Sequence, residues 1–344
     1  MKAPMTVQDC IRNLLGGVAF TAADVGARGD IPFPWIVLDG IAEFVSFEAD
    51  PVACERLKRT YAERGNGHLY RIVPHALSAN GGMRTLYRTA SPSGSSFFDP
   101  DIPLLREYVN RDYLYPISTI DVVTYPARTM FEESGAADSD LIKLDIQGCE
   151  LEVLQSLSPD ILGSAVMIEL EASVLKRNSN YPTFCDIHEF MTAQGFELLD
   201  MWPDRVQRTR NGSRRAFLEG IFGVYIDSPS ISPRIWEVDM IYFRTPANLN
   251  QQLNIAKLFK LAIAFCLYGF FSEALCAIEW GEAHDRVSAN DAERAKQSVV
   301  CWHRLTRYRY RYSLGAFARL YRWLLHHFEL PAITTRADYI HHDR

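Results

Sequence analysis

The chain has 344 residues, 48% of them hydrophobic and 23% charged, enough for one large globular domain and a smaller addition. A net charge of -6 argues against nucleic-acid binding by the protein as a whole. The seven cysteines are scattered and lack the spacing of a zinc site, so we predict reduced thiols and a cytoplasmic location. The most apolar run, residues 258–271, is short and contains Lys260, so we expect neither secretion nor a membrane span.

The first part of the chain predicts a helix and then strands that alternate with helices. Apolar residues recur at helical spacing over residues 5–17, and the helix ends at the Gly16–Gly17 pair. Two prolines within residues 31–35 allow only a short helix after the first strand, whereas Asp50 and Pro51 begin a longer one. The strands predicted here are the one that ends before Gly26 and those over residues 43–48, 70–78 and 84–88.

The later part continues the alternation and then becomes helical. Further strands are predicted over residues 120–123, 141–145, 165–170, 196–199 and 220–226, with helices over 151–157 and 184–194. Alternation of this kind predicts a parallel sheet, and the last two strands suggest an antiparallel end. We therefore divide the chain into an N-terminal helix (1–20), an α/β domain (21–245) and a helical C-terminal region (246–344).

The stretch TAADVGARGD, residues 21–30, reads as a strand that ends in a glycine turn. Gly26 and Gly29 let the backbone bend close to a ligand, and Asp24 adds a carboxylate at the strand end. Glu48 ends the next strand about twenty residues downstream, the spacing at which an acidic group accepts the two ribose hydroxyls of a nucleoside. The third glycine of a dinucleotide fingerprint is missing, and Asp24 suits the ammonium and sulfonium of S-adenosylmethionine better than a pyrophosphate. The turn therefore favours a methyl donor over a nicotinamide cofactor.

A second motif, DLIKLDIQGCELEVL over residues 140–154, is the most specific stretch of the chain. Strand alternation puts Lys143 and Asp145 on one side, and Gly148 allows a tight exit into a helix that starts with acidic residues. Together with the glycine turn, this motif resembles the FkbM-type family of S-adenosylmethionine-dependent methyltransferases, with Gln147 at a position where the family usually has Glu. Five further stretches agree in the correct order, namely residues 24–27, 47–51, 76–78, 95–96 and 119–121.

The resemblance covers roughly residues 20–227 and implies a class I methyltransferase fold, a Rossmann-like seven-stranded and mostly parallel sheet with one antiparallel strand. It implies that S-adenosylmethionine binds over the ends of the first strands and that Asp145 faces the reacting methyl group. The residues that it assigns to the cofactor, with their immediate neighbours, are Asp24, Gly26, Ala27, Arg28 and Gly29 at the methionine end, Glu48 and Ala49 at the ribose, and His75, Ala76 and Leu77 at the adenine.

The reaction that the resemblance implies is O-methylation of a hydroxyl on a sugar, glycan or secondary metabolite. Asp145 and Lys143 are the candidate catalytic residues, because an oxygen acceptor must lose a proton during the transfer. N-methylation and a non-catalytic nucleotide-binding or scaffold role remain as alternatives. Glu169 and Glu171 could join Asp145 as metal ligands, but strand-end carboxylates are more often solvated or capping, so no metal is predicted.

The C-terminal region contains a basic stretch in an otherwise acidic protein. Arginines alternate with aromatic residues over 302–323, and no acidic residue occurs between Glu293 and Glu329. One interpretation is a helix pair that packs its aromatic side chains on the α/β domain, and another is a surface for an anionic partner. A lid or a homodimer contact is a third.

Overall fold

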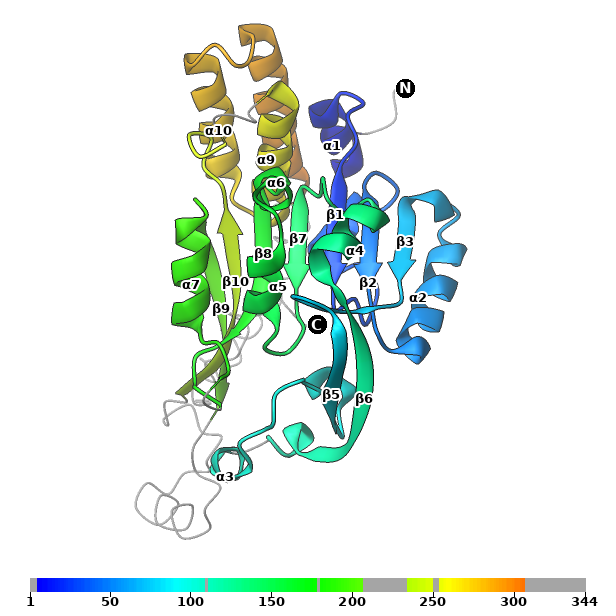
Figure 1. The fold of residues 1–344 in the computed structure, drawn as a ribbon. Coiled ribbons are helices and arrows are strands. Elements are labelled where there is room, and N and C mark those ends of the chain that lie inside the picture. Colours follow the sequence, from blue (N-terminus) through cyan, green and yellow to red (C-terminus); the bar gives the residue numbers. More distant parts are fainter. Residues whose placement is uncertain (1–4, 109–110, 178–179, 207–233, 250–253, 307–344) are drawn as a thin grey trace, which may run out of the picture. The chain divides into compact units, whose positions relative to one another are not determined.

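The computed structural model describes residues 5–108, 111–177, 180–206, 234–249 and 254–306. They form two compact units, which Figure 1 shows in one ribbon. Of the described residues, one unit combines 5–18, 31–41 and 254–306, and the other combines 19–30 with those between 42 and 249. The segment after the glycine turn thus groups with helices that are distant in the sequence, a grouping that a linear division cannot represent. The boundaries 1–20, 21–245 and 246–344 stay a proposal.

The larger unit is built on a seven-stranded sheet in the order β3-β2-β1-β7-β8-β10-β9. Only β10 runs antiparallel to its neighbours, β8 and β9, and the other paired strands are parallel. The strands are β1 (Thr21–Val25), β2 (Glu43–Phe47), β3 (Tyr70–Val73), β7 (Leu141–Leu144), β8 (Met167–Ser173), β9 (Glu197–Val206) and β10 (Arg234–Phe243). This order confirms the expected class I methyltransferase fold. The strand order reverses between β1 and β7, and open α/β sheets generally bind ligands at the carboxyl ends of strands at such a reversal.

Two strands differ from the sequence predictions. The strand expected over residues 70–78 divides at Pro74, which has no N–H for the sheet, into β3 and a short β4 (Ala76–Ser78) that joins a second sheet. The strand β10 was not predicted, although its apolar residues alternate with Glu237 and Asp239 as in a half-buried strand. The strand expected over 220–226 lies outside the described residues.

The second sheet has three strands in the order β4-β6-β5. The strands β5 (Gly82–Thr89) and β6 (Pro116–Pro126) are antiparallel, and β4 runs parallel to β6. Residues 90–115 connect β5 to β6 and contain η3 (Pro92–Gly94), α3 (Ile102–Leu105) and η4 (Asp112–Leu114). Residues of this connection line a pocket.

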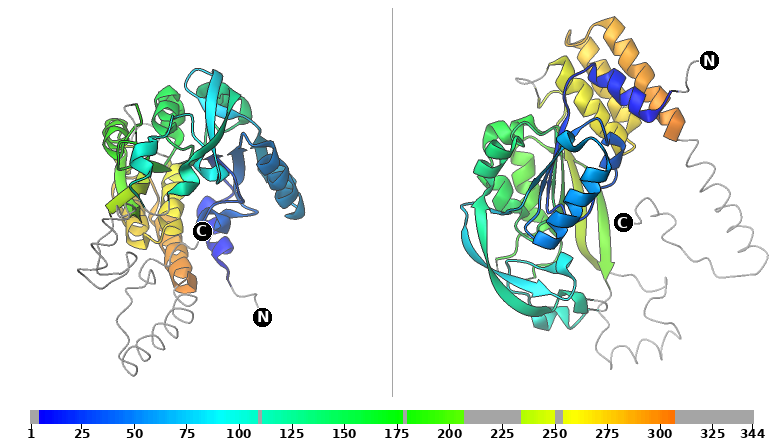
Figure 2. Two further views of the ribbon diagram at one scale, coloured as in Figure 1. Left: turned by 90° about the horizontal axis from the view of Figure 1, so that it is seen from below. Right: turned by 90° about the vertical axis from the view of Figure 1, so that its right-hand side faces the viewer.

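One face of the large sheet carries the hydrophobic core. Alternate strand residues such as Val25, Ile142 and Ile168 pack there with the helices that follow β6, β7 and β8. The right-hand view of Figure 2 shows these green helices on one side of the strands. They are α4 (Ala127–Ser134), α5 (Glu150–Ser156), α6 (Pro159–Ser164) and α7 (Phe184–Ala193).

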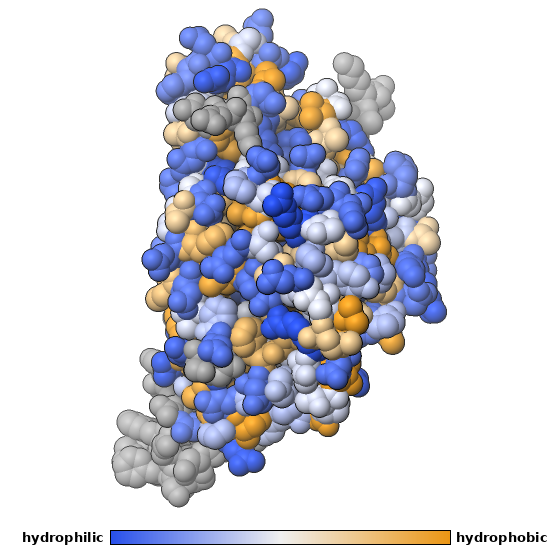
Figure 3. Space-filling model, in the orientation of Figure 1, coloured by the Kyte–Doolittle hydropathy of each residue, from blue (hydrophilic) through white to orange (hydrophobic). Residues whose placement is uncertain are grey.

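A helix flanks the β3 edge of the sheet (Figure 1). Helix α2 (Pro51–Glu63) follows β2, and the short η2 (Gly67–Leu69) precedes β3. Asp50 caps α2 by accepting a hydrogen bond from the backbone N–H of Val52 at 2.9 Å, as the Asp50–Pro51 pair predicts. On the face seen in Figure 3, hydrophobic residues are scattered among hydrophilic ones and form no continuous band over the described part of the chain.

The smaller unit is helical. It contains α1 (Val7–Leu15), η1 (Trp35–Leu38), α9 (Ile255–Leu267), α10 (Phe271–Ala283) and a helix over residues 289–306. Helix α1 ends at Gly16, which has a left-handed φ of 58°, as predicted. Trp35 is buried and donates a 2.8 Å hydrogen bond to the hydroxyl of Tyr268, so the 31–41 segment is held to the helices. None of the described helices is both long and apolar enough to cross a bilayer.

Candidate functional site

The two sequence motifs lie at the same edge of the sheet, where the parallel strands β1, β2, β7 and β8 have their carboxyl ends. The closest approach is at Gly26, where a Cβ atom would lie 2.1 Å from the carbonyl oxygen of Asp145. Gly26 also has a φ of 92°, which an L side chain rarely adopts. The N–H of Asp145 donates to the carbonyl of Val25 at 3.0 Å. The glycine turn and the second motif, more than a hundred residues apart in sequence, are therefore in direct backbone contact.

The amides of the glycine turn are satisfied within the protein. The N–H groups of Gly26 and Ala27 both donate to the carbonyl oxygen of Phe47, at 2.9 and 3.0 Å. The guanidinium of Arg28 lies 3.3 Å from a carboxylate oxygen of Asp50. These contacts hold the turn against the end of β2. Because the N–H groups of Gly26 and Ala27 are already bonded, these two residues would contribute to a ligand site through the backbone conformation of the turn.

Glu48 follows β2 directly and is buried. Its Oε1 accepts a hydrogen bond from the N–H of Asp50 at 2.7 Å, which fixes the direction of the carboxylate. Burial raises the pKa of Glu48, and the hydrogen bond from Asp50 and the charge of Arg28 oppose this rise. Hydroxyl donors from a ribose would offset the cost of burying this charge. Ala49 beside it is exposed, as is Gly29 in the turn.

The residues predicted to lie at the adenine have different environments. His75 is partly exposed, and its ring packs against Tyr125 with 3.9 Å between ring centroids. Ala76 is partly exposed, whereas Leu77 is buried in the core of the large sheet. His75 and Ala76 therefore remain accessible to a ring, and Leu77 supports them from behind.

Charged side chains stand in a row on the face of the sheet opposite to the core. Asp24 on β1 is in register with Lys143 on β7, and Lys143 is in register with Glu169 on β8. All three residues are buried. The ammonium of Lys143 also donates to Oδ2 of Asp145 at 3.2 Å. The two candidate catalytic residues are thus an ion pair, and the buried ammonium lies among carboxylates that compensate its charge.

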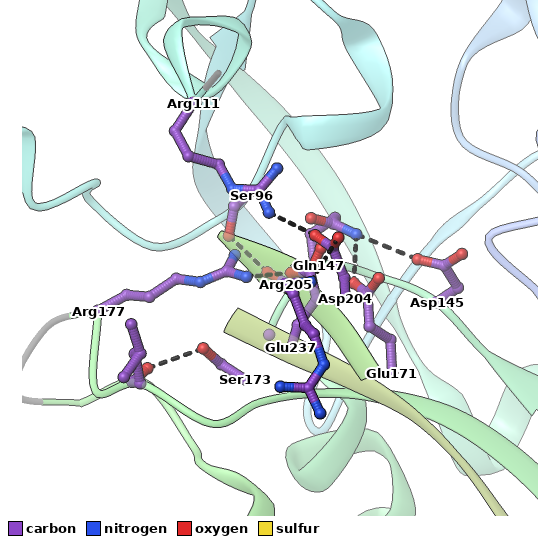
Figure 4. Close-up of polar contacts among 12 residues, drawn as sticks. Ser96, Arg111, Asp145, Gln147, Glu171, Ser173, Arg177, Asp204, Arg205 and Glu237 are labelled. Atoms are coloured by element: carbon purple, nitrogen blue, oxygen red, sulfur yellow. Dashed lines mark hydrogen bonds and ion pairs between the residues drawn. The ribbon is translucent and has the colours of Figure 1, made fainter. Parts of the chain in front are cut away.

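Gln147 links the carboxylates at the ends of β7 and β8 (Figure 4). Its Nε2 donates to Oδ1 of Asp145 at 3.1 Å and to Oε2 of Glu171 at 2.7 Å. Its backbone is left-handed, with a φ of 53°, which is uncommon for a residue with a side chain. The carbonyl of Gln147 accepts a 2.6 Å hydrogen bond from the hydroxyl of Ser96.

The rest of the second motif holds this loop in shape. Glu150 is buried and accepts hydrogen bonds from the N–H groups of Ile146 and Gly148 at 2.9 and 2.8 Å. Burial raises the pKa of Glu150 to about 7, against the effect of these hydrogen bonds. A Cβ on Gly148, whose φ is 105°, would lie 2.6 Å from the ring of Tyr181. Glu150 and Gly148 therefore both maintain the conformation of this loop.

A pocket opens beside Gln147, with about 420 Å³ of empty space when the open solvent at its mouth is included. Both apolar and polar side chains line it, and the polar ones include Ser96, Asp99, Asp101, Gln147 and Arg177. Its lining residues are Gly94, Ser96, Phe98, Asp99, Pro100, Asp101, Leu104, Leu105, Leu114, Gln147, Arg177 and Tyr181. The polar loop over residues 91–96 contributes Gly94 and Ser96. Arg177 and Tyr181 were missed, because no local pattern marks residues that reach a site from a separate loop.

A buried tryptophan supports one side of this region. Trp236 is fully buried, and the guanidinium groups of Arg177 and Arg111 lie 4.8 and 5.1 Å from its ring. Arg177 pairs with Glu237, and Arg111 pairs with Asp204 (Figure 4). Trp236 therefore packs in the interior and is not accessible to a ligand.

Glu171 lies in an acidic environment at the end of β8. Burial raises its pKa well above the usual value, and the nearby carboxylates of Glu237, Asp145 and Asp239 raise it further. Arg177 acts in the opposite direction. Within the described ranges, no group of three or more His, Cys, Asp or Glu side chains is arranged to hold a metal ion.

Comparison with solved structures found several chains with weak similarity to this one. Among solved structures, the chain is similar to StiE O-MT residues 961–1257, with 11% identity, a TM-score of 0.32 and coverage of 77% of this chain and 80% of that one. It is also similar to precorrin-6y C5,15-methyltransferase from Geobacter metallireducens GS-15, with 9% identity, a TM-score of 0.31 and coverage of 71% and 92%. A third is the delta-N METTL16 MTase domain, with 11% identity, a TM-score of 0.30 and coverage of 68% and 78%.

Among curated proteins, no sequence matches this chain significantly. The model of the methyltransferase FkbM domain matches residues 24–198, a span that contains the glycine turn, Glu48, His75 and the whole second motif. Since this match covers half of the 344 residues, the chain belongs to the FkbM family of methyltransferases.

Proposed function

We propose that this protein transfers a methyl group from S-adenosylmethionine to a hydroxyl group of a sugar, glycan or secondary metabolite. The observation that carries the proposal is the backbone contact between Gly26 and Asp145. It joins the turn expected to bind the cofactor to the carboxylate expected to face the methyl group. The joint lies at the switch point of the sheet, where open α/β folds bind ligands.

The side chains at this edge suit a cationic nucleoside. Glu48 is a buried carboxylate whose Oε1 is fixed by the N–H of Asp50, and its position after β2 fits the ribose hydroxyls. Asp24 and Asp145 would favour the ammonium and the sulfonium, and His75 and Ala76 would lie beside the adenine. The bound cofactor supplies an electrophilic methyl group and a neutral leaving group. We assign Arg28, Gly29, Ala27 and Ala49 to the same site as neighbours that shape it.

The pocket beside Gln147 is the place that we assign to the acceptor. It opens next to the end of β7, so a molecule within it would lie near Asp145. In-line displacement requires that the attacking atom be held on the axis of the breaking bond, and the walls of the pocket would provide this positioning. Lys143 would hold Asp145 in a fixed orientation through their 3.2 Å contact. The carboxylates around the pocket favour a hydroxyl over an amine acceptor, since a neutral hydroxyl needs a proton acceptor in order to react.

Titration calorimetry of the full chain tests the proposal. We expect S-adenosylmethionine and S-adenosylhomocysteine to bind and NAD not to bind. Binding of NAD alone would identify an oxidoreductase, and binding of none of the three would point to a scaffold. A screen of hydroxyl and amine acceptors with a labelled methyl donor would then separate O- from N-methylation.

A further inference from the structure

A hydroxyl that accepts a methyl group must give up its proton, so the site needs a carboxylate oxygen that can take it. Asp145 is the obvious candidate, but both of its oxygens already accept hydrogen bonds. Oδ2 accepts from the ammonium of Lys143 at 3.2 Å, and Oδ1 accepts from the amide of Gln147 at 3.1 Å. Asp145 is therefore well placed to attract a cation and badly placed to receive a proton.

Glu171 is the neighbouring carboxylate and is bound differently. Its Oε2 accepts from Gln147 at 2.7 Å, and no hydrogen bond to its Oε1 is formed by the residues that the structure describes. Glu171 is partly buried near the end of β8, the strand next to β7. Gln147, which bonds to it, lines the pocket. The free oxygen of Glu171 thus lies one hydrogen-bonded residue away from the pocket assigned to the acceptor.

The surroundings of Glu171 make it basic. On the adjacent strand, Asp239 is in register with it, and Glu237 is two residues away along β10. Asp145 adds a third carboxylate from the end of β7, and Arg177 is the cation that faces the group. Burial and these three carboxylates raise the pKa of Glu171, while Arg177, already paired with Glu237, opposes the rise only in part.

We propose that Glu171 takes the proton of the acceptor hydroxyl during methyl transfer, with Gln147 as the positioning residue that aligns it beside Asp145. The inference rests on the proposed function. In the transfer, the bond between the methyl carbon and sulfur breaks, and its electron pair stays on sulfur. A bond forms between the hydroxyl oxygen and the methyl carbon, and the hydroxyl proton passes to Oε1 of Glu171.

The charge of the cofactor would prepare Glu171 for this role. A proton acceptor must be ionised, and a nearby positive charge favours the ionised form of a carboxylate. S-adenosylmethionine brings a sulfonium to this edge of the sheet, whereas S-adenosylhomocysteine has a neutral sulfur and is otherwise almost the same molecule. Binding of the first should therefore release a proton from Glu171 that binding of the second leaves in place.

Calorimetry in buffers of different ionisation enthalpy measures this proton release directly and needs no acceptor. We expect S-adenosylmethionine to release more protons than S-adenosylhomocysteine near neutral pH, by up to about one proton per chain. Glu171→Gln should abolish the difference and change the affinity for S-adenosylhomocysteine by less than about threefold. Glu189→Gln makes the same chemical change at an exposed position of α7 and should behave like the unmodified protein.

The possible results separate the two proposals. If neither ligand binds, the proposed function is wrong. If both bind with equal proton release, or if the difference survives in Glu171→Gln, then Glu171 does not sense the sulfonium and the inference is overturned. A large loss of affinity for S-adenosylhomocysteine in Glu171→Gln would also overturn it, because Glu171 would then belong to the cofactor site. The comparison of the two ligands on the unmodified protein stands even if the variant does not fold.

Discussion

Replacement of Glu48 by alanine is the most direct test of the cofactor site. The carboxylate is buried, and its Oε1 accepts a hydrogen bond from the N–H of Asp50 at 2.7 Å. Since this bond already fixes the orientation of the side chain, a ligand that bonds to the carboxylate loses little conformational entropy in ordering it. A hydrogen bond between a charged acceptor and a hydroxyl contributes roughly 1.5–3 kcal/mol. Glu48→Ala should therefore weaken binding of S-adenosylhomocysteine by about ten- to hundredfold in titration calorimetry.

Two further variants make the result interpretable. Glu48→Gln keeps an oxygen for the N–H of Asp50 but removes the charge, and its loss of affinity should be smaller than that of Glu48→Ala. Glu43→Ala changes an exposed glutamate at the start of the same strand and should leave the dissociation constant unchanged. An unchanged dissociation constant in Glu48→Ala, with the melting temperature preserved, would refute the assignment of the ribose to Glu48.

Three other perturbations follow from the geometry of the site. Asp145→Asn should lower turnover once an acceptor is known and should weaken binding of S-adenosylmethionine more than that of S-adenosylhomocysteine, because only the first carries a sulfonium for this carboxylate; equal effects on both ligands with near-normal turnover would contradict this placement. Gly26→Ala should destabilise the protein by more than about 2 kcal/mol, because its Cβ would meet the carbonyl oxygen of Asp145 at 2.1 Å, whereas Gly29→Ala, with open space around it, should melt like the unmodified protein. Glu150, with a pKa raised to about 7, should favour the folded state below about pH 4.5 and lose this contribution as the pH rises to about 7. The unfolding free energy of the unmodified protein relative to Glu150→Gln should fall across this window by up to about 3 kcal/mol, and a flat difference would contradict the assignment of the proton.

Local patterns in the sequence predicted the two motifs and most of the sheet. The glycine turn and the stretch 140–154 each place their chemistry within a few residues, so strand alternation and glycine positions were enough to find them. The strand β10 was missed although its sequence carries a strand pattern, since Trp236, Val238 and Met240 alternate with Glu237 and Asp239. Both carboxylates belong to the acidic environment of Glu171.

The pocket beside Gln147 could not be predicted, because its walls come from segments that only the fold brings together. Leu104 and Leu114 lie in the connection between β5 and β6, whereas Gln147 and Tyr181 follow β7 and β8. The left-handed backbone of Gln147 could not be predicted from the sequence either. On each side of Gln147, a backbone N–H donates to the side chain of Glu150, and these hydrogen bonds are visible only in the folded loop. The basic stretch lies outside the described residues from position 307 onward, so its interpretation is unchanged.

The segment 31–41 gives the helical unit an unusual relation to the chain. This unit is not a module joined at one end, because the polypeptide enters it after Asp30 and leaves it again before Ala42, between the first two strands of the sheet. A chain shortened near residue 245 would leave Trp35 without Tyr268 and would expose an apolar segment that is otherwise buried. The segment 31–41 thus depends on helices that follow it by more than two hundred residues in the sequence. An insertion or deletion in this segment would change the packing of the helical unit and also the connection between the first two strands of the sheet.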